Sequence, residues 1–327
     1  MILITQPCLL SAGTLAATTT VPPLLQLQSD LADLRPGDVT GLDWIATAAD
    51  DVPNALCVTR PDTSARLALA SRKLTRRERE ACAATAHGKL IESLIGRRAI
   101  LAMTASASFA LTSDILYRAL ASKVPGPNGA FVPNHAMRWR ELNANLPDAP
   151  IQVLFPPDGS IEQRIVSEII LYEGCESHAT TRLPEDPIRR FAICTDLRTD
   201  QVITRATANM VVATWLRGQG AAAIALVGIA ALLAEPELET ALPLNGVMPD
   251  FANIASGQYK AVLPVYLLTI MPPHTASSIA AAVAPLLAET VIGPLGRLPR
   301  RGLAPLSADD RVKLRASLGR EFENAGD

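Results

Sequence analysis

The sequence predicts an α/β protein with mostly parallel sheets, divided into two domains. Runs typical of buried strands alternate with runs typical of helices along the whole chain, which is the order of elements in α/β folds. The chain has 327 residues, where a common domain has about 100–200. Hydrophobic residues make up 49% of the chain and aromatic residues only 4%, so we expect a core built mainly from Ala, Leu, Ile and Val.

Net charge and hydropathy exclude several classes of function. Charged residues make up 19% of the chain and the formal net charge is −2, so neither nucleic acid nor an anionic membrane is an expected partner. The longest apolar stretch, residues 220–234, is shorter than the ~20 residues of a membrane-spanning helix. We interpret it as a buried strand that runs into a helix.

The N-terminal residues, MILITQPCLL, do not have the pattern of a signal peptide. The first basic residue is Arg35, and Gln6 and Pro7 interrupt the apolar run. We interpret residues 1–5 as the first strand of the folded protein, and we see no export signal in this chain.

The next elements are predicted from apolar spacing and helix-end signals. Residues 73–86 form an amphipathic helix with a charged outer face, and residues 89–104 form an extended, buried segment that crosses the molecule. Residues 111–124 form a helix with Ser113 as its N-cap, and Pro125 follows its end.

The second half of the chain continues the alternation. Pro, Gly and Asn residues predict a loop at 125–134. We expect strands at 151–155, 223–228 and 260–270, and helices at 160–172, 208–217, 278–292 and 307–318.

Cysteine and histidine spacing argues against a metal site. The five cysteines, at positions 8, 57, 82, 175 and 194, form no CxxC pair, and the four histidines are widely scattered. The spacings of Cys57 from Cys82 and of Cys175 from Cys194 suit two local disulfides, with Cys8 unpaired. Four buried free thiols are the alternative.

Five stretches of the chain share a pattern, in the same order, with one known family. They are PDTSARLALASRKLTRREREAC (61–82), residues 111–134, WRELNANLPDAPIQVLFPP (139–157), residues 242–269 with NGVMPDFANIASGQY, and GPLGRLPRRGLAPLSADDR (293–311). Together they resemble the periplasmic phosphate-binding proteins, the substrate-binding subunits of phosphate ABC importers. The resemblance covers residues 50–320, and the 242–269 stretch is its most specific part.

The resemblance implies a type II periplasmic binding protein, in which two α/β lobes are joined by two crossing strands. Residues 1–97 with 260–327 would form lobe I, and residues 98–259 would form lobe II. A branch of the family has cysteines like Cys57 with Cys82 and Cys175 with Cys194, which favours two disulfides and the periplasm. The resemblance further implies a monomer without cofactor that docks on ABC permease subunits.

One expected ligand loop opens the helix at 160, where the family has a Ser-Gly-Thr run. Ser160, Ile161 and Glu162 take its place, and Gly159, Ser160 and Ile161 are the candidate ligand residues. Glu162 then puts a carboxylate where a donor is expected, which would repel an anion. Alternatively, Ser160 is a simple N-cap and Glu162 a first-turn acid favoured by the helix dipole.

The family's first ligand loop follows its first strand, and here its alignment register stays open. In one register Pro7, Cys8 and Leu9 replace the Ser and Thr donors; in the other, Ser11 and Thr14 are ligand residues. An ordinary small-residue turn is the alternative.

Acidic residues replace the glycine-rich turn that precedes the family's first cysteine. Asp50 and Asp51 lie there, and plain solvated loop acids are the alternative to a role at the site.

The best-retained loop is ASRK, where Ser71 offers a hydroxyl and Arg72 a guanidinium that fits an oxyanion. The alternative for Arg72 is the start of a charged surface helix. We interpret Arg97 and Arg98 as surface or hinge residues near the cleft.

These residues favour a receptor for inorganic phosphate or a similar oxyanion, serving an ABC importer. The alternative is a diverged binding-protein-like chain that has lost phosphate and binds another ligand or has a structural or regulatory role. An enzyme is not expected, because the chain has no GxSxG, P-loop, GxGxxG or HExxH motif.

Overall fold

The computed structural model describes residues 42–45, 52–57, 65–85, 88–106, 108–178, 183–207, 210–235, 240–272 and 276–323. The predicted first strand, both registers of the first ligand loop with Ser11 and Thr14, and the acids Asp50 and Asp51 lie outside the described residues.

The described strands form one eight-stranded sheet and one small hairpin. The main sheet has the order β1-β2-β10-β3-β8-β6-β7, and β9 also pairs with β3. Its strands are β1 Leu42–Trp44, β2 Ala65–Ala70, β3 Lys89–Thr104, β6 Val153–Phe155, β7 Ile203–Arg205, β8 Ile224–Gly228, β9 Thr240–Leu242 and β10 Val262–Met271. The hairpin pairs β4 Lys123–Pro125 with β5 Phe131–Pro133.

The expectation of mostly parallel sheets is wrong, because the main sheet is mixed. Strands β1 and β2, β6 and β7, and β6 and β8 are parallel, whereas β10–β2, β10–β3, β3–β8 and β3–β9 are antiparallel. Every antiparallel pair of the main sheet involves β3 or β10. The alternating βα pattern gives parallel pairs within each half of the sheet, and the two long strands that link the halves run against their neighbours.

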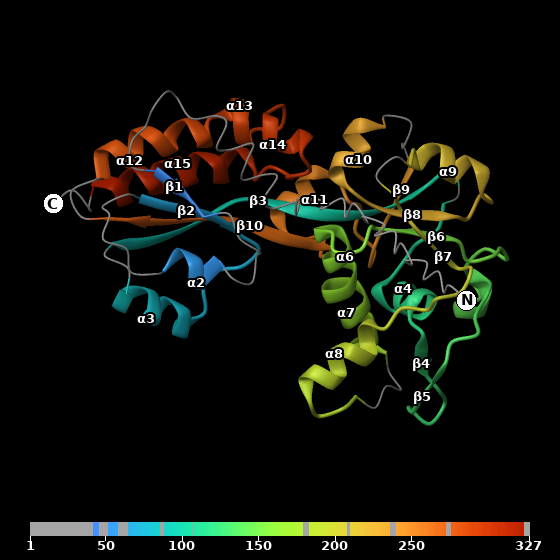
Figure 1. The fold of residues 1–327 in the computed structure, drawn as a ribbon. Coiled ribbons are helices and arrows are strands. Elements are labelled where there is room, and N and C mark those ends of the chain that lie inside the picture. The colour runs from blue at the N-terminus through green and yellow to red at the C-terminus, as the bar shows by residue number, and fades with distance from the viewer. Residues whose placement is uncertain are drawn as a thin grey trace, which may run out of the picture.

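Strand β3 is the longest described strand and joins the two halves of the sheet. Its first part, Lys89–Ala99, pairs with β10, and its second part, Ile100–Thr104, pairs with β8. Figure 1 shows β3 and β10 running side by side across the middle of the molecule. The predicted extended segment at 89–104 is confirmed, as is the strand predicted near 260–270.

Helices cover both faces of the sheet in each half (Figure 1). In the half with β1 and β2, helices α12 to α15 lie on one face and α2 and α3 on the other. The described helical segments are α2 Val52–Leu56, α3 Arg76–Thr85, α4 Ser113–Leu120, α5 Trp139–Leu142, α6 Ile161–Ile165, η1 Val166–Leu171, α7 Tyr172–Ser177, α8 Pro187–Thr195, α9 Val212–Gly218, α10 Ile229–Ala234, α11 Phe251–Ser256, α12 Ala276–Val283, η2 Ala284–Leu287, α13 Glu289–Ile292, α14 Arg297–Arg300 and α15 Ala308–Glu323.

Three predicted helix features have clear outcomes. Ser160 is the N-cap of α6, and its hydroxyl accepts a hydrogen bond from the backbone N–H of Gln163 at 3.0 Å. The N-cap of α4 is Thr112 and not the predicted Ser113, because the Thr112 hydroxyl accepts from the N–H of Ile115. The long apolar stretch at 220–234 is β8 followed by α10, as predicted.

Both predicted disulfides are present. Cys57 pairs with Cys82 and joins the end of α2 to α3, and Cys175 pairs with Cys194 and joins α7 to α8. Each bridge therefore fixes a peripheral helix to its neighbour.

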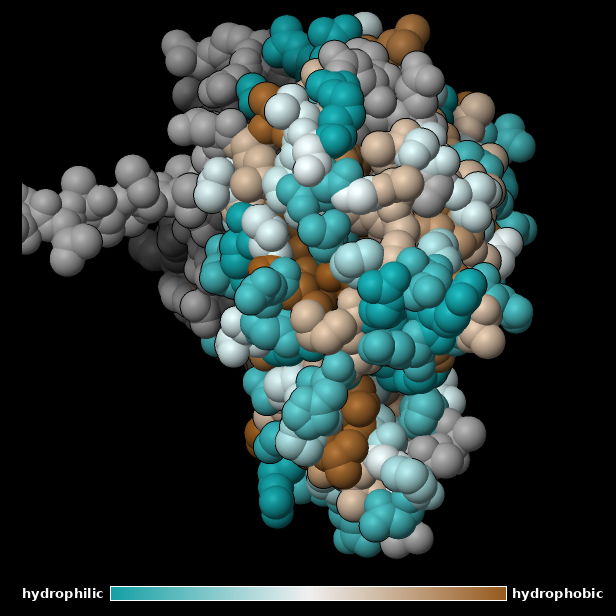
Figure 2. Space-filling model, turned by 90° about the vertical axis from the view of Figure 1, so that its right-hand side faces the viewer, coloured by the Kyte–Doolittle hydropathy of each residue, from teal (hydrophilic) through white to brown (hydrophobic). Residues whose placement is uncertain are grey.

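Buried apolar residues form one large core through both halves of the sheet and a smaller one beneath α2 and α3. On the face seen in Figure 2, exposed apolar residues form scattered patches among hydrophilic ones, which is common for a protein surface. Within the described residues, no single helix is long and apolar enough to cross a membrane, although the bent pair Ile279–Leu287 and Glu289–Arg300 meets the length and composition together.

Candidate anion site between strand β2 and helix α6

The first side of the candidate site is the turn that follows β2. All six residues of β2 are buried, which fixes the end of the strand in the core. Ser71 follows directly and is itself only 6% exposed. Its hydroxyl oxygen accepts a hydrogen bond from Nη1 of Arg164 at 3.4 Å. Two segments that are far apart in the sequence therefore meet at Ser71.

The second side is the start of α6, which directly follows the end of β6. Gly159 has a φ of +75°, so the turn between strand and helix uses a conformation that favours glycine. The Gly159 N–H donates to Oε1 of Gln163 at 2.6 Å, and Ile161 is buried. Helices α6, η1 and α7 continue one another from Ile161 to Ser177. A helix of this length places the positive end of its dipole at Ser160.

Each of the two predicted hydroxyls accepts a hydrogen bond within the chain. Ser160 accepts from the backbone of α6 and Ser71 accepts from Arg164. A hydroxyl has one proton to donate in addition to its acceptor lone pairs. Both oxygens are thereby oriented while both protons stay available for an oxyanion.

Arg72 was predicted to bind an oxyanion, but it forms an ion pair with a carboxylate of the chain. Its two terminal nitrogens both donate to the carboxylate of Glu78, each at 2.7 Å, and Nη1 also donates to the Lys73 carbonyl. The hydrogen bonds from Arg72 lower the pKa of Glu78 to about 2. Arg72 can take up an external oxyanion in the predicted way only if this pair opens.

Glu162 does not present a free carboxylate to the site. It forms an ion pair with Nη2 of Arg98, and the two side chains are 16% and 7% exposed. Nη1 of Arg98 donates to the Arg301 carbonyl at 2.7 Å. A Cβ atom at Gly228 would lie 2.9 Å from the Glu162 carboxylate, so the absence of a side chain there makes room for the pair.

The structure therefore removes the expected repulsion between Glu162 and an anion. Arg98 was predicted to be a surface or hinge residue, but it is buried and neutralises Glu162.

Two cations at the site were not predicted. Arg164 lies four residues after Ser160 and therefore on the same side of the helix, which is the signal that could have identified it. Its Nε donates to Glu168 at 2.6 Å.

The second cation, Arg205, lies at the end of β7, beside the end of β6. Its Nη1 is 3.1 Å from Asp158, and its guanidinium lies 4.6 Å from the centre of the Phe155 ring. No sequence pattern marked this residue. Because β6 and β7 are parallel, their carboxyl ends meet at one edge, where ligands of α/β sheets commonly bind.

The described residues contain no group of three His, Cys, Asp or Glu side chains that could hold a metal ion. The candidate site thus consists of hydroxyls, a helix N-terminus and guanidinium groups that are partly neutralised by carboxylates. Such a set can bind an oxyanion by hydrogen bonds.

Comparison with known proteins supports the fold described above. A family model described as a PBP superfamily domain matches residues 14–289. PstS from Borrelia burgdorferi has a similar structure with a TM-score of 0.56 and 16% identity, over 89% of this chain and 96% of that one. No curated protein matches the chain.

Two further solved structures support the same fold. A possible phosphate binding protein from Planctomyces limnophilus has a TM-score of 0.55 and 16% identity, over 78% of this chain and 80% of that one. The high-affinity periplasmic phosphate-binding protein PfluDING, solved with phosphate, has a TM-score of 0.50 and 13% identity, over 89% and 91% of the two chains. The predicted periplasmic-binding-protein fold is confirmed.

Proposed function

The chain belongs to the PBP superfamily, and on that basis we propose that it is a non-catalytic binding protein for phosphate or a similar oxyanion. The main support for the proposal is that Ser71 lies beside the helix that Ser160 begins. Arg164 of that helix donates a hydrogen bond to the Ser71 hydroxyl. Gly159 and Ile161 complete the helix start. The buried pair of Glu162 with Arg98 supports it, because Arg98 neutralises the carboxylate that was expected to repel an anion.

Ligand binding would act through two lobes. We assign residues 1–97 with 260–327 to lobe I and residues 98–259 to lobe II, with β3 and β10 as the crossing strands. Ser71 then belongs to lobe I and Arg164 to lobe II, so their hydrogen bond spans the interface. A ligand that bridges the same two segments would favour the closed form by its differential affinity for that form.

We further propose that the protein works outside the cytoplasm as part of an importer. The two disulfides are typical of an oxidising compartment such as the periplasm. A monomer that closes over its ligand would then dock on the permease subunits of an ABC transporter.

Isothermal titration calorimetry with inorganic phosphate tests the proposal. Ser71→Ala removes one hydroxyl donor, and a hydrogen bond to a charged group contributes ~1.5–3 kcal/mol, so the Kd should rise about 10- to 100-fold. Ser177→Ala is a matched control, because the Ser177 hydroxyl bonds only its own helix backbone at Gly174. An equal loss in both variants would contradict a ligand role for Ser71.

A second candidate function has its own supporting observation, the pairing of Arg72 with Glu78. If the best-retained cation of the family pattern is permanently occupied, the chain is a diverged member that binds another ligand or has a structural role. Absence of both heat and thermal shift with millimolar phosphate would favour this alternative. Glu78→Gln removes the negative charge that pairs with Arg72, and recovery of phosphate binding in that variant would identify the pair as the cause.

A further inference from the structure

A groove that takes no part in the candidate anion site runs along one edge of the sheet. Two neighbouring cavities, of about 370 and 500 Å³, both include Glu92, Ser93 and Ser317 in their walls. Together they extend along β3 from Gly88 to Arg97. Each volume lies in the range of ~300–1,000 Å³ that is common for ligand pockets.

The floor of the groove is the free edge of β3. Between Lys89 and Gly96, β3 pairs with β10 on one side, and no described strand pairs with its other side. The edge ends at Arg97, whose backbone exchanges hydrogen bonds of 3.0 and 2.7 Å with Ala304. An edge strand directs about half of its N–H and C=O groups away from its partner, so this edge offers a row of main-chain donors and acceptors.

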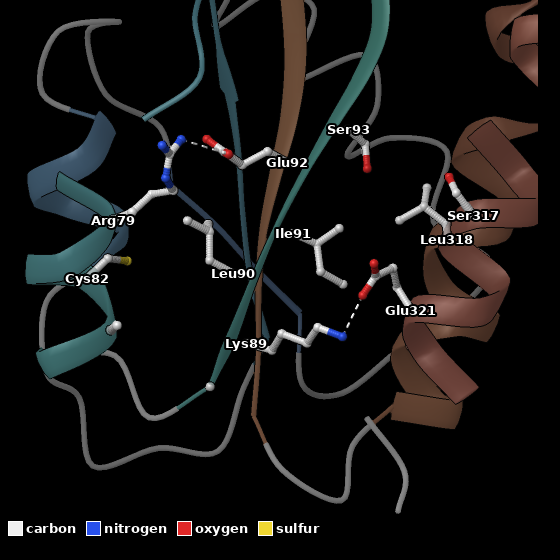
Figure 3. A pocket seen from close by; sticks show the side chains of 12 residues that line it. Arg79, Cys82, Lys89, Leu90, Ile91, Glu92, Ser93, Ser317, Leu318 and Glu321 are labelled. Atoms are coloured by element: carbon white, nitrogen blue, oxygen red, sulfur yellow. Dashed lines mark hydrogen bonds and ion pairs between the residues drawn. The ribbon is translucent and has the colours of Figure 1, made fainter. Parts of the chain in front are cut away.

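Two helices form the walls of the groove. Figure 3 shows β3 in front of β10, with α3 on one side and α15 on the other. Leu90 and Glu92 point toward the α3 side, and Ile91 and Ser93 point toward the α15 side.

The charges in the groove favour an acidic occupant. Three of its cations are neutralised, because Arg79 pairs with Glu92, Lys89 with Glu321 and Lys313 with Asp310. Arg97 and Arg320 also line the groove. Nη1 of Arg97 donates to the Ala255 carbonyl at 2.7 Å, and neither arginine pairs with a carboxylate in the part of the chain that the structure describes. An excess of positive charge is therefore left in the cavity of about 500 Å³, whose walls include both residues.

We propose that this groove binds an extended acidic peptide segment of a partner protein, which adds as a strand to the free edge of β3. Main-chain hydrogen bonds to residues 89–96 supply the affinity, as in other β-augmentation interfaces. Alternate side chains of the peptide contact the apolar parts of Leu90 and Ile91, and its carboxylates lie against Arg97 and Arg320. Eight residues of strand at ~3.3 Å each give about 26 Å of edge, enough for a hexapeptide.

Fluorescence polarisation with a labelled hexapeptide of alternating Glu and Val tests the proposal on the full chain. We expect saturable binding below about 1 mM. Arg320→Glu should weaken it about tenfold or more, since it reverses a charge that lines the groove. Arg189→Glu on α8 is the matched control, because Arg189 is an exposed Arg that does not line either cavity, and it should leave binding within about twofold.

Two further measurements decide whether the peptide adds as a strand. Hydrogen exchange should slow at amides within 89–96 when the peptide is bound, and a peptide N-methylated at every second residue should lose binding. Equal binding of the N-methylated peptide, or of a Lys and Val peptide, would overturn the proposal. So would sedimentation that shows the chain dimerising through this edge, with Arg320→Glu abolishing the dimer and no peptide bound.

Discussion

Breaking the buried ion pair between Arg98 and Glu162 should destabilise the protein more than breaking any exposed pair. Arg98 is 7% exposed at its side chain and Glu162 is 16% exposed. Arg98 also donates to the Arg301 carbonyl, so its guanidinium links β3, α6 and the segment after α14. Glu162→Gln removes the negative charge and leaves the positive charge buried.

The expected loss in the free energy of unfolding depends on how much buried charge is left without a partner. Removing one partner of a buried pair costs ~3–5 kcal/mol. The cost here should lie lower, at about 2–3 kcal/mol, because glutamine keeps an oxygen acceptor and the Arg301 carbonyl stays in place. Arg98→Met combined with Glu162→Gln removes the buried positive charge as well, and should recover much of the loss.

A double-mutant cycle in urea measures the coupling directly. The wild type, Arg98→Met, Glu162→Gln and the double variant are unfolded under one set of conditions, and the free energies of unfolding are compared. We expect a coupling free energy of about 2 kcal/mol between the two side chains. The exposed pair of Arg76 with Glu80, whose side chains are 88% and 61% exposed, is the control and should couple by ~0.5 kcal/mol or less. Similar coupling in the two cycles would refute the reasoning.

Other features of the fold give further predictions. Replacing Cys57 and Cys82 together by Ser should lower the free energy of unfolding by ~3 kcal/mol, as the loop of 25 residues implies, which urea unfolding would measure. Gly174→Ala should cost ~2 kcal/mol or more and lower the melting temperature, because its Cβ would lie 2.2 Å from a carbonyl oxygen of α4. Arg72 lowers the pKa of Glu78 from 4.5 to about 2, so its stabilisation is present above pH 4.5 and is lost as the pH falls toward 2. Unfolding of Glu78→Gln should lack that part of the acid dependence.

The sequence predicted the main strands and helices because each of them depends on a local pattern of residues. The segment at 89–104 alternates and is apolar enough to identify a buried strand, and 220–234 separates into a strand and a helix. The direction of the strands was not predictable in the same way. Parallel pairing follows from βα alternation, but β3 and β10 are long strands that connect the two halves, and their direction depends on the whole topology.

The candidate site was predictable only where a local signal exists. Ser160 was identified because an N-cap has a local pattern, and Ser71 because it lies in the family-like ASRK run. The sequence did not predict which carboxylate each arginine binds. Arg72 turned out to bind Glu78, six residues away, and Arg98 to bind Glu162, which lies 64 residues away. Such pairings depend on tertiary contacts between segments that have no sequence pattern in common.

The ion pair of Arg98 with Glu162 can also separate a ligand role of this region from a purely structural one. The pair is neutral, so Glu162→Gln raises the local charge by one and Arg98→Met lowers it by one, while the double variant leaves it unchanged. If the region selects an anion, phosphate affinity measured by calorimetry should be highest in Glu162→Gln, lowest in Arg98→Met, and similar in the wild type and the double variant. If the pair only stabilises the fold, both single variants should weaken phosphate binding, because both leave one buried charge unpaired. Opposite signs therefore require an anion site near α6, and equal signs would contradict it.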